Sequence, residues 1–111
     1  MKTVKTSNLI GPALDWAVAT CEGYSAAQAA DIVFCDSKAF AYSTDWSQGG
    51  PIIEREGIGL TYSDSTPCWW YATSQQGKRF LRLGDTPLIA AMRCYVSSKL
   101  GDEVEIPEGL V

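Results

Sequence analysis

The segment STDWSQGGPIIEREG occupies residues 43–57 and concentrates polar and glycine residues that packing alone does not require. Pro51 suits the first position of a helix, because its missing N–H costs nothing there and its fixed φ is already helical. Gly50 would then be the N-cap, and Gly57 is placed to end the helix in a left-handed conformation. We therefore expect a short helix that begins at Pro51, preceded by an exposed polar loop.

The loop before this helix has the chemistry of a small recognition site. Free N–H groups and the positive end of a helix dipole can hold an anion, and adjacent glycines let a ligand approach the backbone. Gly-Gly-Pro is also an ordinary turn, and the loop's aspartate can hydrogen-bond its own backbone, so a purely structural role stays open. The candidate ligand-binding residues are Thr44, Asp45, Trp46, Gln48, Gly49 and Gly50, with Trp16 as a candidate neighbour.

Composition limits the classes of function. The 111 residues predict one globular domain over the whole chain, long enough to bury a core without disulfides or metal. With 13 acidic and 9 basic residues the net charge is −4, which disfavours a general nucleic-acid binder. No apolar signal segment or membrane-spanning run is present, so we expect a cytoplasmic protein with reduced thiols and no membrane partner.

The residue types that most catalysis needs are missing. The chain contains no histidine, which excludes His-based acid–base catalysis and Ser–His or Cys–His nucleophiles. The four cysteines form no Cys-x-x-Cys pair, so no metal site is expected. Without a Walker-type or dinucleotide fingerprint no cofactor is expected either. The sequence therefore does not predict an enzyme.

Three predicted helices each begin at a proline and end at a glycine. These helices begin at Pro12, Pro51 and Pro87, with Thr86 as the last N-cap, and end at Gly23, Gly57 and Gly101. Strands, including one hairpin, are expected over residues 2–5, 32–35, 39–42, 58–63, 68–73 and 79–83, and the acidic tail from about residue 102 is expected to be extended. The pattern predicts an α+β domain with an antiparallel sheet of about four or five strands, two longer helices and one short helix.

Two further groups of residues, one basic and one aromatic, are candidate interaction surfaces. Lys78, Arg79 and Arg82 form a basic cluster, which either blunts an exposed strand edge or contacts phosphate groups of a nucleic acid. Trp69 and Tyr71 share one face of a predicted strand, because consecutive strand residues point to opposite faces. Large apolar groups on both faces predict that both are covered, by the protein's own helices, by a ligand or by a second copy of the chain.

Four runs of sequence carry a family resemblance. They are LDWAVATCEG at residues 14–23, STDWSQGGPIIEREGI at 43–58, TPLIAAMRCYV at 86–96 and KLGDEV at 99–104. Together they resemble the NinX-like family of small phage and prophage proteins, and binary patterning alone does not produce runs of this length. The resemblance implies a phage origin and residence in the bacterial cytoplasm. The family carries no established activity to transfer, although its name places it in a phage genome region that also encodes recombination-related proteins.

These observations predict a phage-encoded accessory protein that acts by binding rather than by catalysis. Its partner would be a host or phage protein, or a small anionic, nucleotide-like ligand held at the loop before the short helix. One alternative is a nucleic-acid-associated recombination accessory that uses the basic cluster. A second alternative is a structural homodimer joined through the face of Trp69 and Tyr71.

Overall fold

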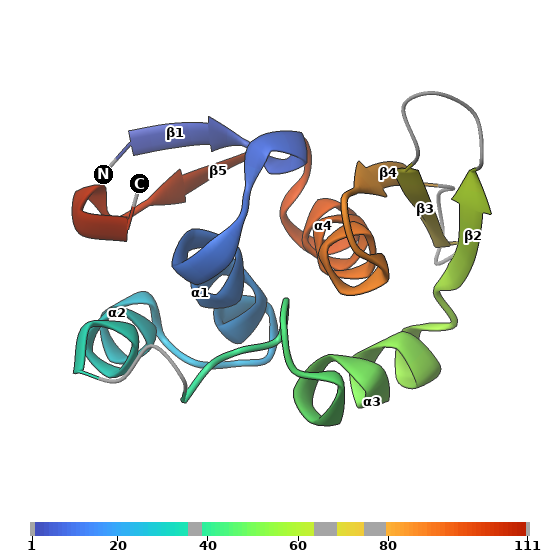
Figure 1. Ribbon diagram of the computed structural model, residues 1–111. Helices are drawn as coiled ribbons and strands as arrows, with labels where there is room; N and C mark the ends of the chain where they lie inside the picture. Colours follow the sequence, from blue (N-terminus) through green and yellow to red (C-terminus); the bar gives the residue numbers. More distant parts are fainter. Residues whose placement is uncertain (1, 36–38, 64–68, 75–79, 111) are drawn as a thin grey trace.

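Helix α4 (Pro87–Leu100) lies at the centre of the fold, between two small sheets and the other helices (Figure 1). The computed structural model describes residues 2–35, 39–63, 69–74 and 80–110. Thr86 caps α4 as predicted, because its Oγ1 accepts a hydrogen bond from the Ile89 N–H at 3.2 Å. Residues 88–97 of α4 are buried except for the half-buried Arg93, which suits the run of alanine and other apolar residues in this helix.

A three-stranded antiparallel sheet covers one side of α4. Its strands are β2 (Gly59–Ser63), β3 (Trp69–Ser74) and β4 (Phe80–Gly84), in the order β2-β3-β4. The approach is close at Gly84, where an added Cβ would lie 2.5 Å from the Ala90 nitrogen of α4. The three predicted strands from residue 58 to residue 83 are therefore confirmed to within one or two residues.

A second antiparallel sheet joins the two ends of the chain. Strand β1 (Lys2–Lys5) pairs with β5 (Glu103–Ile106), and short 3-10 turns follow at Thr6–Asn8 and Glu108–Leu110. The prediction of an extended acidic tail was incomplete, because Val104 and Ile106 alternate with glutamates and are buried in the core. Within the described residues, five strands form two sheets rather than the expected single sheet.

Helices α1 (Gly11–Cys21) and α2 (Ala26–Cys35) pack beside the terminal sheet. The first helix is confirmed, but the predicted hairpin over residues 32–35 and 39–42 was wrong, because its first strand is the end of α2. A capping box starts α2: Ser25 Oγ accepts from the Gln28 N–H at 3.1 Å, and Gln28 Oε1 accepts from the Ser25 N–H at 3.3 Å. These paired caps favour helix over strand.

Helix α3 (Trp46–Glu56) begins five residues before the predicted start. Asp45 is its N-cap and Pro51 lies inside it, so the prediction of Gly50 as N-cap and Pro51 as first residue was wrong. The loop expected over residues 43–51 is thus mostly helical. The predicted end is confirmed, because Gly57 adopts a left-handed conformation with φ of 65°.

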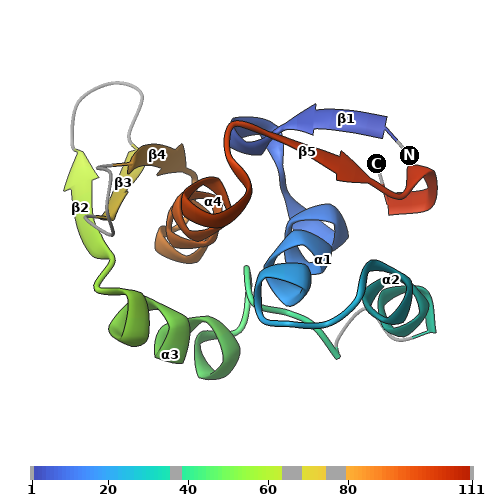
Figure 2. The same cartoon turned by 180° about the vertical axis from the view of Figure 1, so that it is seen from behind.

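The α+β class is confirmed by the described residues, which form four helices and five short strands. The radius of gyration is 13.1 Å, close to the value of about 13 Å expected for a compact domain of this length. Within the described ranges, no helix combines the length and the apolar character that crossing a membrane requires. Seen from behind, the three-stranded sheet and α2 lie at opposite ends of the molecule (Figure 2).

Candidate functional site

A hollow of about 240 Å³ lies where the start of α3 meets the start of α4. The segment before α3 contributes two hydroxyl residues, and the first residue of α3 contributes an indole. The start of α4 contributes a mainly apolar wall. Leu88 and Ile89 of that wall are almost fully buried. The lining residues are Ser43, Thr44, Trp46, Thr86, Pro87, Leu88 and Ile89.

The two candidate tryptophans have different environments. Trp46 is 53% exposed at the rim of the hollow, although a large apolar side chain is usually buried. Trp16 is only 4% exposed, and its Nε1 donates a hydrogen bond to the Ala26 carbonyl at 3.2 Å. Trp16 therefore joins α1 to the start of α2 and does not line the hollow.

The side chain of Asp45 caps the N-terminus of its own helix, α3. One carboxylate oxygen accepts hydrogen bonds from the Ser47 N–H at 2.9 Å and from the Ser47 hydroxyl at 2.7 Å. These bonds hold the pKa of the exposed Asp45 carboxyl below its usual value. The start of α3 therefore carries an ionised carboxylate beside Trp46.

The other predicted residues of this segment hold the backbone in place. Gln48 Oε1 accepts from the Ala41 N–H at 2.9 Å. Gly49 is buried, and an added Cβ would lie 2.5 Å from the Tyr42 carbonyl oxygen and 2.6 Å from Leu88 Cδ2. Gly50 is half-buried and has more space. Thr44 and Trp46 are therefore the predicted residues that line the hollow, whereas Gln48 and Gly49 support it.

Asp15 of α1 holds the backbone of Ser43, one of the residues that line the hollow. This buried carboxylate accepts a hydrogen bond from the Ser43 N–H at 2.8 Å. Burial raises its pKa, because the ionised form loses hydration that two bonds from Ser43 only partly replace. Asp15 was not among the predicted site residues, although a carboxylate between Leu14 and Trp16 on an apolar helix is a signal for a buried polar contact.

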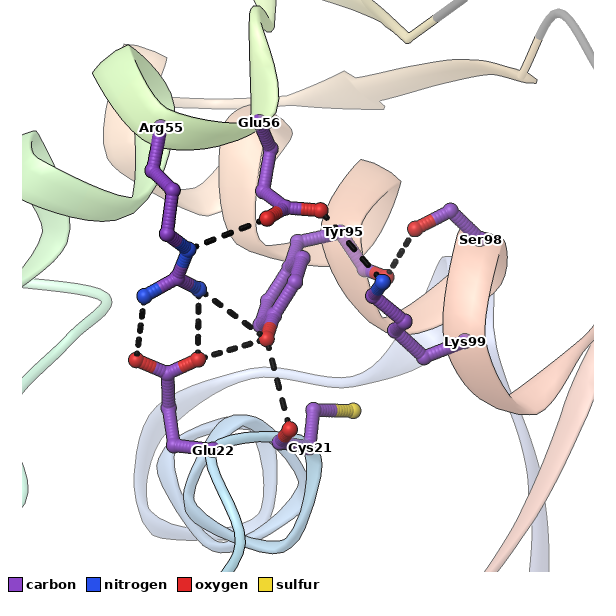
Figure 3. Close-up of polar contacts among 7 residues, drawn as sticks. All are labelled: Cys21, Glu22, Arg55, Glu56, Tyr95, Ser98 and Lys99. Carbon is purple, nitrogen blue, oxygen red and sulfur yellow. Dashed lines mark hydrogen bonds and ion pairs between the residues drawn. The ribbon is translucent and has the colours of Figure 1, made fainter. Parts of the chain in front are cut away.

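The far end of α3 is held by a polar clamp, which comprises Glu22, Arg55, Glu56, Tyr95 and Lys99 (Figure 3). Arg55 Nη1 and Nη2 donate to the two carboxylate oxygens of Glu22 at 3.1 and 2.6 Å, and its Nε donates to Glu56 Oε2 at 3.0 Å. Lys99 Nζ lies 3.5 Å from the other Glu56 oxygen. The clamp joins the ends of α1 and α3 to α4.

Tyr95 lies at the inner side of this clamp. Its hydroxyl donates to Glu22 Oε2 at 2.5 Å and accepts from Arg55 Nη2 at 3.2 Å. The hydrogen bonds from Arg55 lower the pKa of Glu22, while burial is the main cause that raises the pKa of Tyr95. Burial also raises the pKa of the neighbouring Cys21 thiol to about 12. A thiol that stays protonated is a poor nucleophile, so Cys21 does not give this cluster a reactive group. The contacts of the clamp instead hold the three helices together.

The two alternative surfaces are only partly within the described residues. Lys78 and Arg79 lie outside them, and so does the side chain of Arg82 on β4. The side chain of Trp69 is likewise outside them, while Tyr71 is half-buried on β3. Among the residues that the structure does describe, no three His, Cys, Asp or Glu side chains gather as metal ligands would.

Comparison with protein-family models shows which family this chain belongs to. A family model described as "Bacteriophage P22, NinX" matches residues 5–99, which is most of the chain and includes both walls of the hollow and the polar clamp. No curated protein matches the sequence.

Proposed function

Because the chain belongs to the bacteriophage P22 NinX family, we propose that it is a phage accessory protein that acts by binding another protein through Trp46 and the adjacent hollow. The exposed indole of Trp46 is the observation that carries this proposal, because it stands beside a mainly apolar hollow rather than in the core. Exposed aromatic side chains beside a pocket are typical anchors of protein interfaces. The binding takes place in the bacterial host cell.

The chemistry at the start of α3 favours a protein over a small anion. An anion at a helix start needs free N–H groups, but the Ser47 N–H is bonded to Asp45 and the Ile89 N–H is bonded to Thr86. The Asp45 carboxylate would also repel an anion. An apolar side chain in the hollow meets neither obstacle.

The charges around the hollow indicate what the partner presents. Asp45 follows Thr44 directly, and the exposed Asp85 precedes Thr86, so a carboxylate stands next to each wall of the hollow in the sequence. Opposite charges at an interface rim accelerate association and exclude wrong partners. The partner should therefore insert an apolar side chain into the hollow and place Lys or Arg near these two aspartates.

The hollow is held in shape before any partner arrives. Asp15 and Gln48 fix the backbone on the N-terminal side of α3, and the polar clamp fixes its C-terminal side. A surface that is already ordered loses less conformational entropy on binding. Trp46 is therefore presented on an anchored helix.

The proposal can be tested by affinity capture from lysate of infected host bacteria, followed by titration of the purified partner. Truncation of an interface tryptophan at a hot spot costs about 2 kcal/mol or more, which is roughly 30-fold in affinity. Trp46→Ala should weaken binding by that order. Asp45→Asn keeps an N-cap and removes the charge, so it should slow association and reduce the salt dependence of binding.

Phe34→Ala provides the matched control, because Phe34 is 57% exposed on α2, in another part of the surface. We expect it to bind the captured partner as the wild type does. Equal binding by Trp46→Ala and wild type, or equal loss in both alanine variants, would remove Trp46 from the interface.

A further inference from the structure

Strand β1 has an edge to which another strand can be added. Within the described residues, the terminal sheet consists of β1 and β5 alone. Strand β5 lies between β1 and α1 in both views, which leaves β1 on the outside of the molecule (Figures 1 and 2). The outer edge of β1 therefore presents backbone N–H and C=O groups that a strand of another chain can bond.

The register of this sheet shows which backbone groups point outward. The Thr6 N–H donates to the Asp102 carbonyl at 2.8 Å, which makes these two residues a hydrogen-bonded pair. Such pairs alternate along an antiparallel ladder, so Val4 also bonds to β5, while Thr3 and Lys5 do not. The N–H and C=O of Thr3 and the N–H of Lys5 therefore point away from β5, and no described residue bonds to them.

An apolar hollow of about 130 Å³ adjoins the same strand. Val4 contributes one side, and Ile10 and Ala13 around the start of α1 contribute another, whereas none of its described lining residues belongs to β5. Ile10 is 54% exposed, although it is apolar. A residue opposite Val4 in an added strand would point to the same face as Val4, so its side chain would reach this hollow.

We propose that β1 is a docking site for an extended segment of another protein, in which an acidic residue precedes an apolar residue. When this segment adds antiparallel to β1, the apolar residue faces Val4 and the acidic residue before it faces Lys5. Lys2 and Lys5 are exposed, and neither forms an ion pair with a described residue. The chain's own β5 has the same pattern, because Glu103 stands opposite Lys5 and the next residue is the valine opposite Val4.

The two lysines make a second copy of the chain a poor occupant of this edge. Pairing of two β1 strands would bring Lys2 and Lys5 of both copies onto one short ladder, and β1 contains no acidic residue to balance them. Lysine on an edge strand is a known device against such self-pairing. The same charges attract an acidic segment, so they select a different partner.

Titration of a fluorescent peptide into the 111-residue protein tests this proposal. The probe is a short synthetic peptide of alternating glutamate and valine, and a lysine–valine peptide is its control. Only the acidic peptide should raise the fluorescence anisotropy, and its binding should weaken as salt is added. Amide NMR should show that this peptide protects the Thr3 and Lys5 N–H groups from hydrogen exchange.

Thr3→Pro tests the backbone contact directly. It removes an N–H that points away from β5, a position on an edge strand where proline is tolerated. It should weaken peptide binding by roughly 3- to 10-fold or more, the worth of one hydrogen bond. Thr3→Val is the matched control, because it changes the same side chain and keeps the N–H, so it should bind as the wild type does.

Ile10→Ser tests the hollow. Ile10 is the N-cap of α1 and makes no side-chain cap bond, whereas serine is a preferred N-cap, so the helix should keep its start. Circular dichroism should show a folded variant, and peptide binding should weaken because one wall of the hollow loses its apolar side chain. Trp46→Ala should bind the peptide as the wild type does, since Trp46 belongs to the other hollow.

Four results would overturn the proposal. The first is no binding of the acidic peptide at millimolar concentration, and the second is equal binding of the lysine–valine peptide. The third is unchanged binding in folded Thr3→Pro and Ile10→Ser. The fourth is self-association of the wild type that Thr3→Pro abolishes, because the occupant would then be a second copy.

Discussion

Two adjacent glycines illustrate how a single residue acts in this fold. Gly49 lies where α3 meets the Tyr42 backbone and the Leu88 side chain, with no space for a methyl group. Gly49→Ala should therefore lower the free energy of unfolding by roughly 1–3 kcal/mol, the usual cost of overpacking. Urea denaturation followed by circular dichroism measures the change.

Gly50 is the internal comparison. Its added Cβ would meet only Trp46 Cε3, at an ordinary contact distance of 3.9 Å. Alanine is the better helix former, but a Cβ on the residue before Pro51 is disfavoured in a helix, so these effects oppose each other and Gly50→Ala should change stability by less than about 1 kcal/mol. A loss of stability in Gly50→Ala as large as that in Gly49→Ala would refute the steric explanation for Gly49.

The sequence predicted both glycines as places where a ligand approaches the backbone. The close contact at Gly49 comes from the protein itself, and Leu88 lies far along the chain. No local pattern can reveal such a contact, because it depends on how α3 and α4 cross. Trp46 and Thr44 were identified as candidates from their own chemistry, and they do line the hollow.

At the scale of single elements, Pro51 inside α3 opposes the helix that contains it. It lacks the N–H that would bond the Ser47 carbonyl one turn earlier. Pro51 is exposed, so replacing it removes little packing. Pro51→Ala should raise the free energy of unfolding by roughly 1–2 kcal/mol, after allowance for the greater entropy of the unfolded chain. Thermal and urea denaturation would show the gain.

Pro12 supplies the control for this prediction. It occupies the first turn of α1, where backbone N–H groups have no partner within the helix. Pro12→Ala should be slightly destabilising, since only the unfolded chain gains freedom. A loss of stability in Pro51→Ala would contradict the interpretation of α3.

Helices α2 and α3 show why element boundaries were harder to predict than element types. Ser25 and Gln28 have capping-box spacing, and so do Asp45 and Gln48. Those signals were locally present, but the apolar run at the end of α2 is too short to separate strand from helix by periodicity. The strong helix-start preference of proline also moved the predicted start of α3 to Pro51.

At the scale of the whole molecule, the parts that could not be predicted are those that join distant segments. Strand β5 shows a clear two-residue alternation, yet its partner β1 lies at the other end of the chain. The hollow likewise unites the approach to α3 with the start of α4, and Asp15 supports it from α1. Alternation and capping indicate which residues form elements, whereas the pairing of elements depends on long-range packing.

The polar clamp joins three helices, so its state should appear in the pH dependence of overall stability. Arg55 lowers the pKa of Glu22 below its ordinary value of 4.5 in the folded protein. This stabilisation is fully present above pH 4.5 and is lost as the pH falls through the lowered pKa, because the unfolded chain takes up the proton first. Arg55 is half-exposed, so the contribution should be about 1 kcal/mol after solvent screening.

Glu22→Gln should therefore lower the free energy of unfolding by about 1 kcal/mol at pH 7. The difference from wild type should shrink as the pH falls below 4.5, since protonated glutamate and glutamine are both neutral. Urea denaturation at a series of pH values measures this convergence. In an Arg55→Met background the same substitution should lose most of its pH dependence, because the main cause of the lowered pKa is gone. Convergence that persists without Arg55 would assign the effect to Tyr95 or Lys99 rather than to the ion pair with Arg55.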